Sequence, residues 1–290
     1  MKLSVIMPCY NAEKTIARQL EALSIQSWTD EWQLVICNNR STDTSMDIVR
    51  SYADKFEKLS IIDAFDKQGA AYALNVGAEN AEGEALLFCD ADDVVGSSWL
   101  TAMGEALLIC DFVACRTDTA RLNGHLPHRH GYGNPQSKGV QKLWYAPFLH
   151  HAGCGTIGIK RSVHSAIGGF DETIPHCFDT DYCIRAQMFG NVNLHFVPDA
   201  VLHIGYRDTA YGTFKQSFNY AEYNVYLYSK YGRARQNPKS LWGIYLRDWR
   251  KLLNRILNKY LYRDRYVLYW MLGRQIGRIK GCLSFSVPPV

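Results

Sequence analysis

Several sequence patterns that identify common protein classes are missing from the 290 residues. No G-x-G-x-x-G or G-x-x-x-x-G-K-[ST] motif occurs, which argues against dinucleotide oxidoreductases and P-loop nucleotide hydrolases. No run of 18 apolar residues occurs, so we expect no membrane-spanning segment. The first residues lack the long apolar stretch of a signal peptide, and we therefore expect a cytoplasmic protein.

Cysteine pairing is also missing. None of the nine cysteines forms a C-x-x-C pair, and most lie in apolar runs such as Leu34–Cys37 and Leu86–Cys89. This pattern predicts reduced thiols rather than a disulfide framework or a zinc site.

Charge is distributed unevenly along the chain. From Lys230 onward there are 14 lysines and arginines but only two acids, Asp248 and Asp264, whereas the preceding residues carry a net charge of −8. On a helical wheel, Tyr245–Tyr260 separates into an apolar, aromatic side and a basic side. A second basic, aromatic stretch follows at Arg263–Lys280.

These stretches predict a C-terminal basic amphipathic helical extension. Such helices bind anionic membrane surfaces, and we expect peripheral membrane contact through residues 239–280. The alternative is that the apolar side packs on the rest of the chain or on a partner subunit, for example in a homodimer. No nucleic-acid recognition motif accompanies the charge, so nucleic acid is not an expected partner.

Strands and helices are expected to alternate in the first ninety residues. The apolar runs predict strands at Leu3–Met7, Gln33–Cys37, Leu59–Asp63 and Ala85–Cys89. Helices are expected between them, the first capped by Asn11 and running to Ser27. This alternation predicts an α/β fold with a Rossmann-like, mostly parallel sheet flanked by helices.

Polar residues follow each expected strand, where α/β sheets bind their ligands. The most acidic of these segments is Asp90-Ala91-Asp92-Asp93. Its carboxylates repel one another unless a cation intervenes, and carboxylate oxygens suit Mg²⁺ or Mn²⁺. The alternative is an acidic cap at the start of a helix.

Taken together, the motifs resemble glycosyltransferase family 2, whose members have the GT-A fold. The resemblance extends over roughly residues 3–205 and rests on Ser4–Asn11, Asn39–Asp43, Asp90–Asp93, Gly168–Glu172 and Asp179–Arg185. It implies an inverting enzyme that moves a sugar from a nucleotide-diphosphate sugar to an acceptor hydroxyl with Mn²⁺ or Mg²⁺. It also implies a nucleotide-sugar-binding part at 1–95 and an acceptor-binding and catalytic part at 96–227, followed by the basic tail at 228–290.

Three sets of site residues are expected besides the catalytic one. The resemblance implies metal ligands at Asp90, Asp92 and His203. Acceptor contacts are expected at His151, Gly155 and Asp181, near the acceptor edge, with local hydrogen bonding as the alternative for His151. The resemblance also implies donor contacts at Pro8, Tyr10, Asn11, Asn38, Asn39, Asp43, Gly69, Asn75, Asp90, Ala91 and Arg207. Asn38 stands where the family usually has an acid, so the resemblance does not determine which nucleobase the donor carries.

Asp179 resembles the catalytic base of the family. An inverting displacement needs a group that takes the proton of the attacking hydroxyl, and a positioned carboxylate can do so. The alternative is that Asp179 caps a helix and Asp181 pairs with Arg185 four residues later.

The resulting hypothesis is a glycosyltransferase of cell-surface polysaccharide or glycolipid assembly. We expect a UDP-, GDP- or dTDP-sugar as donor and a glycan or lipid-linked glycan as acceptor, at the inner face of the cytoplasmic membrane. The alternatives are a glycosyltransferase with a soluble acceptor and a catalytically silent nucleotide-sugar binder. A nucleotidyltransferase would normally have a Gly-rich, basic loop after the first strand, which Pro8–Asn11 lacks.

Overall fold

The computed structural model describes residues 1–125, 136–237, 241–257 and 265–288, and these form two compact units. The first unit comprises residues 1–122, 134–141 and 150–205, and the second comprises 123–133, 142–149 and 206–290. The tail predicted at 228–290 belongs to the second unit. The boundaries predicted at 95/96 and 227/228 stay predictions.

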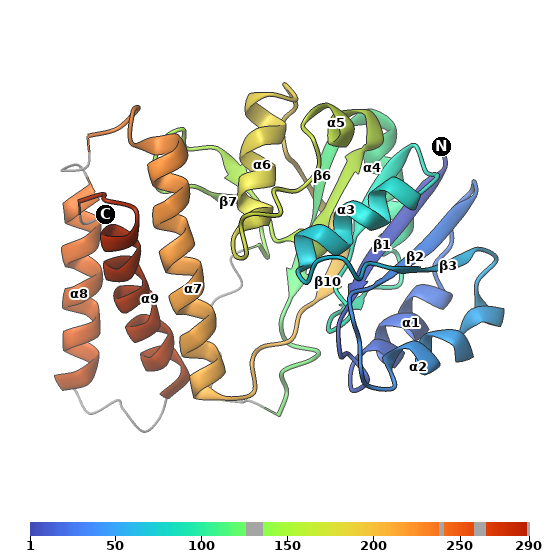
Figure 1. The fold of residues 1–290 in the computed structure, drawn as a ribbon, viewed down its shortest axis with the longest axis horizontal. Coiled ribbons are helices and arrows are strands. Elements are labelled where there is room, and N and C mark those ends of the chain that lie inside the picture. The colour runs from blue at the N-terminus through green and yellow to red at the C-terminus, as the bar shows by residue number, and fades with distance from the viewer. Residues whose placement is uncertain (126–135, 238–240, 258–264, 289–290) are drawn as a thin grey trace. The chain divides into compact units, whose positions relative to one another are not determined.

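An eight-stranded, mainly parallel sheet forms the centre of the first unit (Figure 1). Its strand order is β3-β2-β1-β4-β9-β6-β10-β5. The strands are β1 (Leu3–Cys9), β2 (Trp32–Asn38), β3 (Leu59–Asp63), β4 (Ala85–Phe88), β5 (Val94–Val95), β6 (Phe112–Asp118), β9 (Ile157–Lys160) and β10 (His195–His203). Two further strands, β7 (Gln141–Lys142) and β8 (His150–His151), form a small second sheet.

Helices cover both faces of the large sheet because neighbouring residues of a strand point to opposite sides. Val5 and Met7 of β1 belong to one apolar cluster, and Ile6 belongs to the other. The first cluster includes α1 (Ile16–Ser24), α2 (Ser45–Ser51) and α4 (Trp99–Ile109). The second includes α3 (Ala70–Asn80) and α6 (Phe178–Met188), while the short α5 (Arg161–Ala166) follows β9. The predicted two-sided α/β layering is confirmed.

The direction of β9 decides which segments meet at the edge of the sheet where the predicted site residues lie. β9 runs antiparallel to β4 and β6, with Gly158 opposite Leu87 and Val113. Its beginning therefore lies at the edge where β4 and β6 end. The residues that precede β9 consequently share an edge with the residues that follow β4, β6 and β10.

The first helix begins later than the sequence predicted. Asn11 has a positive φ of 48° and does not cap a helix, since α1 begins at Ile16 with Thr15 as its N-cap residue. The predicted cap is wrong because the Asn11 side chain accepts a hydrogen bond from the Thr42 N–H instead, at 2.8 Å. The loop after β1 is thereby joined to the loop after β2.

Three helices form most of the second unit: α7 (Ala210–Leu227), α8 (Trp242–Leu257) and α9 (Arg265–Ser284). Helix α7 continues into a short π-helical turn at Tyr228–Gly232. Gly273, Gly277 and Gly281 lie one turn apart on α9, directly against the backbone of α7. A Cβ atom at Gly277 would collide with the Phe218 carbonyl oxygen. Glycine at these positions therefore permits the close approach of α9 to α7.

Asp248 of α8 forms ion pairs with two arginines of α9. Asp248 accepts from Arg278 at 3.1 Å and lies 3.4 Å from Arg274, and the Arg278 guanidinium also stacks on the rings of Trp144 and Tyr245. Burial, followed by the charge of Arg274, lowers the pKa of Arg278 from its ordinary value. Among the described residues, no helix is both long and apolar enough to cross a bilayer.

Candidate active site

The turn after β4 brings three carboxylates together. Ligand oxygens of Asp90, Asp92 and Asp93 all lie within 4.8 Å of one another. Burial, and then the charges of Asp90 and Asp92, raise the pKa of Asp93 well above its ordinary value. A hard divalent cation would relieve this repulsion and take carboxylate oxygens as ligands. The donor set therefore fits Mn²⁺ or Mg²⁺.

The three acids do not cap a helix, so that alternative is wrong. The turn leads into β5, and α4 begins only at Trp99. Val94 of β5 pairs with His203 of β10, and the Gly205 N–H donates to Asp93 Oδ1 at 3.2 Å. The acidic turn is thus fixed to the end of β10.

A single 3₁₀ turn, Cys154–Thr156, lies between the acidic turn and Asp179. The Cys154 N–H donates to Asp179 Oδ2 at 3.3 Å. The next residue, Gly155, lies against Asp90, since a Cβ atom there would come within 2.7 Å of Asp90 Oδ2. Burial and the charges of both aspartates raise the pKa of the Cys154 thiol well above its ordinary value. One turn therefore links the predicted metal ligand to the predicted base.

Asp179 is the second residue of α6, and Cys177 with a φ of 59° is the N-cap residue. The other oxygen of Asp179, Oδ1, accepts from the Thr180 N–H at 2.7 Å. Burial raises the pKa of Asp179 above its ordinary value, although the hydrogen bonds from Thr180 and Cys154 oppose this change. A raised pKa increases the proton affinity of the carboxylate, which suits a general base.

The predicted acceptor contacts differ in their surroundings. His151 of β8 lies 3.5 Å from the Thr180 hydroxyl, and burial lowers its pKa to about 4, so its imidazole is neutral. Asp181 is fully buried, and its carboxylate accepts from Arg185 Nε at 2.7 Å. The predicted ion pair with Arg185 is confirmed. An acceptor contact would require an exposed carboxylate at Asp181, and this side chain has no exposed surface.

The loops after β1 and β2 are joined by side-chain oxygens. Asp43 Oδ2 accepts from the Glu13 N–H at 3.0 Å, and Oδ1 accepts from the Ser45 N–H at 3.0 Å. Burial alone would raise the pKa of Asp43, but the hydrogen bonds from Ser45 and Glu13 outweigh it and hold the pKa below its ordinary value. Tyr10 extends from this edge with 53% of its surface exposed.

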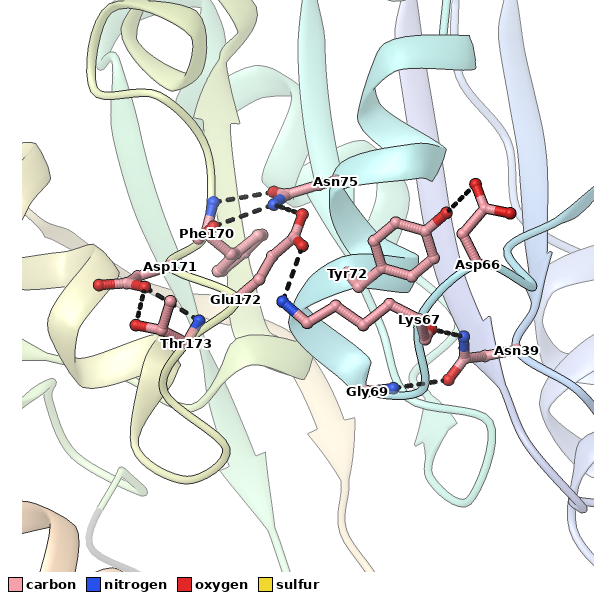
Figure 2. A network of polar contacts seen from close by, with 10 residues as sticks. All are labelled: Asn39, Asp66, Lys67, Gly69, Tyr72, Asn75, Phe170, Asp171, Glu172 and Thr173. Atoms are coloured by element: carbon pink, nitrogen blue, oxygen red, sulfur yellow. Dashed lines mark hydrogen bonds and ion pairs between the residues drawn. The ribbon is translucent and has the colours of Figure 1, made fainter.

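Asn38 and Asn39 hold the ends of β2 and β3 together. Asn38 Nδ2 donates to Asp63 Oδ1 at 3.1 Å. A carboxylate therefore lies beside Asn38, the position at which the family usually has an acid. Asn39 Nδ2 donates to the Lys67 carbonyl, and its Oδ1 accepts from the Gly69 N–H at 2.8 Å (Figure 2). Gly69 has a φ of 148°, a conformation that residues with side chains rarely adopt.

Asn75 of α3 binds the loop that precedes α6 (Figure 2). Its amide donates to the Phe170 carbonyl and to Glu172, both at 2.9 Å, and its oxygen accepts from the Phe170 N–H at 2.8 Å. Lys67 lies 3.2 Å from the other oxygen of Glu172. Gly169 has a positive φ of 68° and packs against the Asn75 amide. Helix α3 is therefore joined to the loop that precedes α6.

His203 does not join the acidic cluster. Its Nδ1 lies 2.7 Å from Asp118 Oδ2, at the paired ends of β10 and β6. Burial would raise the pKa of Asp118, but hydrogen bonds from His203 and from the Ala120 and Arg121 N–H groups hold it below its ordinary value. Arg207 lies in the second unit. All of the predicted donor, metal and acceptor contacts, including those of Pro8, Ala91 and Arg207, stay predictions.

Sequence reasoning missed two groups next to the predicted site residues. One is the Cys154 backbone N–H, which donates to Asp179 and which no sequence pattern singled out. The other is Asp118, which ends β6 and pairs with His203. The available signal for this pair was an acid and a histidine that each follow a short apolar run in the sequence.

Comparison with known proteins identifies the sequence family. The family model described as "Glycosyl transferase family 2" matches residues 4–168, more than half of the chain. The chain is 37% identical over 102 residues to the poly(ribitol-phosphate) beta-glucosyltransferase of Bacillus spizizenii and 39% identical over 94 residues to the uncharacterized glycosyltransferase YibD of Escherichia coli. These stretches cover 34% and 32% of this chain, but only 16% and 27% of the two relatives.

Two solved structures share the fold over nearly the whole chain. S. aureus TarS 1–349 in complex with UDP-GlcNAc aligns with a TM-score of 0.57 at 18% identity, covering 99% of this chain and 93% of that one. The mannosyltransferase PcManGT from Pyrobaculum calidifontis, in complex with GDP-Man and Mn²⁺, aligns with a TM-score of 0.67 at 18% identity, covering 97% and 87%. The predicted GT-A fold class is thereby confirmed.

Proposed function

The chain belongs to glycosyltransferase family 2 and is a glycosyltransferase, and from this premise we propose an inverting, cation-dependent transfer from a nucleotide-diphosphate sugar to an acceptor hydroxyl. UDP- and GDP-sugars are the first donor candidates, because the two structural neighbours hold UDP-GlcNAc and GDP-Man. A cell-surface polysaccharide is the proposed destination, because relatives include poly(ribitol-phosphate) glycosyltransferases.

Asp90 and Asp92 are the proposed ligands of Mn²⁺ or Mg²⁺, with Asp93 behind them. When bound, the cation would offset the negative charge of a nucleoside diphosphate. The Asp93 carboxylate keeps the turn attached to the end of β10 through the Gly205 N–H. Nδ1 of His203 faces Asp118, and the second ring nitrogen, Nε2, is the atom that we propose contacts the donor or the cation.

Asp179 is the proposed general base. Its carboxylate accepts the proton of the acceptor hydroxyl while the hydroxyl oxygen bonds to the anomeric carbon and the bond to the nucleoside diphosphate breaks. The Cys154 and Thr180 N–H groups fix its two oxygens, and the neutral imidazole of His151 lies next to Thr180. These contacts orient the base without adding a positive charge beside it.

The single observation that carries the proposal is the Cys154–Thr156 turn, which contacts Asp179 at one residue and Asp90 at the next. A nucleotide-sugar binder needs only the acidic turn. An inverting transferase also needs a base beside the attacking hydroxyl, on the face of the anomeric carbon opposite the leaving group. The turn contacts both the proposed base and a proposed metal ligand.

The test is thermal stabilisation and nucleoside diphosphate release with a panel of UDP-, GDP- and dTDP-sugars, each with and without Mn²⁺. One nucleotide class should raise the melting temperature only with Mn²⁺, since a ligand at 100 times its Kd stabilises a protein by about 2.7 kcal/mol. Asp92→Asn should remove this effect, whereas Asp47→Asn, an exposed acid on α2, should preserve it. Cation-independent release would overturn the metal assignment, and binding without release would indicate a silent binder.

Peripheral contact with an anionic membrane is the proposed role of α8. Trp242, Leu246, Leu253 and Leu257 lie on one side of this helix, and Leu246 and Leu257 have exposed fractions of 63% and 76%. Arg247, Arg250 and Lys251 are also exposed, on the basic side of the same helix. An apolar strip on a helix with a basic side fits a bilayer interface with anionic lipids, and it would bring the enzyme to lipid-linked acceptors.

A further inference from the structure

Two side chains of the α1 region hold the backbone of the turn that carries Asp90, Asp92 and Asp93. The Gln19 amide donates to the Asp90 carbonyl at 3.1 Å and accepts from the Val95 N–H at 3.0 Å. Arg18 donates to the Asp92 carbonyl at 2.5 Å. Gln19 has no exposed surface, although it lies among the apolar residues of α1.

The Gln19 amide bridges the two ends of the acidic turn. Asp90 begins the turn and Val95 follows it in β5, so one planar group fixes the distance across it. Within the turn, the Asp93 N–H reaches the Asp90 carbonyl only at 3.5 Å. Three neighbouring carboxylates repel one another, and an external support is therefore needed to keep them close before a cation arrives.

We propose that Gln19 is a positioning residue for the cation site. By holding the Asp90 carbonyl toward α1, it orients the Asp90 peptide so that the carboxylate faces Asp92 and Asp93. This inference rests on the proposed function, because it assumes that the three carboxylates bind a divalent cation.

Gln26 supplies a control within the same segment. It lies seven residues after Gln19, is also buried, and makes the same kinds of hydrogen bond. Its amide donates to the Gly96 carbonyl at 2.9 Å and accepts from the Leu100 N–H at 3.0 Å. Its bonds therefore hold the start of α4 and not the acidic turn.

The experiment compares Mn²⁺ affinity, measured by the EPR signal of free Mn²⁺ with and without UDP, in the full chain and in Gln19→Met and Gln26→Met. Methionine keeps the length of glutamine but neither donates nor accepts as the amide does. We expect Gln19→Met to weaken Mn²⁺ binding roughly tenfold, the lower range for residues that orient metal ligands. Gln26→Met should bind Mn²⁺ like the wild-type protein.

Urea denaturation separates positioning from general stability. Both variants remove a hydrogen bond to a backbone carbonyl and leave the N–H of Val95 or Leu100 without the glutamine oxygen, so both should unfold at lower urea concentrations. A merely structural Gln19 would change the urea midpoint alone. If Gln19→Met does not fold, Gln19→Asn and Gln26→Asn replace the pair, since the shorter amide stays polar but cannot span the turn.

Three outcomes would count against the assignments. Wild-type affinity in the Gln19 variant overturns the positioning role. An equal loss in the Gln26 variant also overturns it, because the effect would then come from general loosening. A wild-type protein that binds no Mn²⁺, with or without UDP, overturns the proposed cation site itself.

Discussion

The two units of the chain differ in how far they bury their apolar side chains. In the first unit, apolar residues of adjacent strand positions enter two buried clusters, one on each face of the sheet. In the second unit, α9 is packed against α7 through glycines, while α8 leaves Leu246, Leu253 and Leu257 exposed. Both faces of the large sheet are thus covered, whereas α8 retains an exposed apolar strip beside its bases. Chemistry and attachment are therefore proposed for different units.

Replacing the base should have the largest effect and should leave the second unit unchanged. We expect Asp179→Asn to lower kcat by about 10²–10⁴-fold, the usual contribution of a positioned general base. Melting temperatures with UDP or GDP and Mn²⁺ should stay at the wild-type value. Asp111→Asn is the matched control, because Asp111 precedes β6 at the opposite edge of the sheet. Full turnover by the asparagine variant would remove Asp179 from the mechanism.

The pH dependence of the wild-type enzyme gives a second view of the same residue. Asp179 accepts a proton only when ionised, and burial raises its pKa above the ordinary 3.8. Activity should therefore fall as the pH decreases through this raised pKa, and the acidic limb should be absent from residual Asp179→Asn activity. An unchanged limb in the variant would assign it to another group.

Removing the acid between α8 and α9 should have the next largest effect, now on the second unit. Asp248→Ala leaves the buried Arg278 guanidinium without its carboxylate, and breaking such a pair costs about 3–5 kcal/mol of unfolding free energy. Urea denaturation followed by circular dichroism measures the loss. Asp47→Ala, which breaks an exposed pair with Arg50 on α2, should leave the urea midpoint at the wild-type value. Equal midpoints for both variants would show that the Asp248 pairs do not hold the helices.

The smallest expected effect concerns the exposed strip of α8. Leu246→Gln combined with Leu257→Gln should reduce binding to vesicles with anionic lipids at least tenfold, since burying one leucine contributes about 1.5–3 kcal/mol. Added NaCl should also weaken the binding of the wild-type protein to these vesicles, because it screens the lysine and arginine charges. Leu108→Gln with Ile109→Gln, two exposed apolar residues at the end of α4, is the control. Vesicle sedimentation that does not distinguish the two double variants would favour packing against another protein.

The sequence predicted the parts of the fold in which local pattern and tertiary packing agree. Strands β1 to β4 could be located because they contain short apolar runs, and α1 because its apolar residues recur at helical spacing. Strand β5 could not be found, because its two residues become a strand only by pairing with Leu202 and His203. Asn11 was misread as a cap because its side chain is used across a loop, and sequence propensity does not record such a partner.

The site was predictable as a set of acids but not as an arrangement. Asp90, Asp92 and Asp179 could be named from their resemblance to family motifs, whereas the link between Asp90 and Asp179 through Cys154 and Gly155 depends on the reversed direction of β9. Gln19 left a usable signal, a polar residue among Ile16, Leu20 and Leu23 on the apolar side of α1. A buried amide needs partners, and only the fold shows that they belong to the acidic turn.

The antiparallel course of β9 has an evolutionary consequence. Because β9 begins at the edge where β4 and β6 end, the segment that precedes β9 can change without shifting those strands. Residues 143–149 belong to no strand of the large sheet, so we expect their exchange to leave Asp90–Asp93 in place after β4. Chimeras that graft this segment from a relative should change which acceptor is glycosylated while inheriting the nucleotide preference of the host.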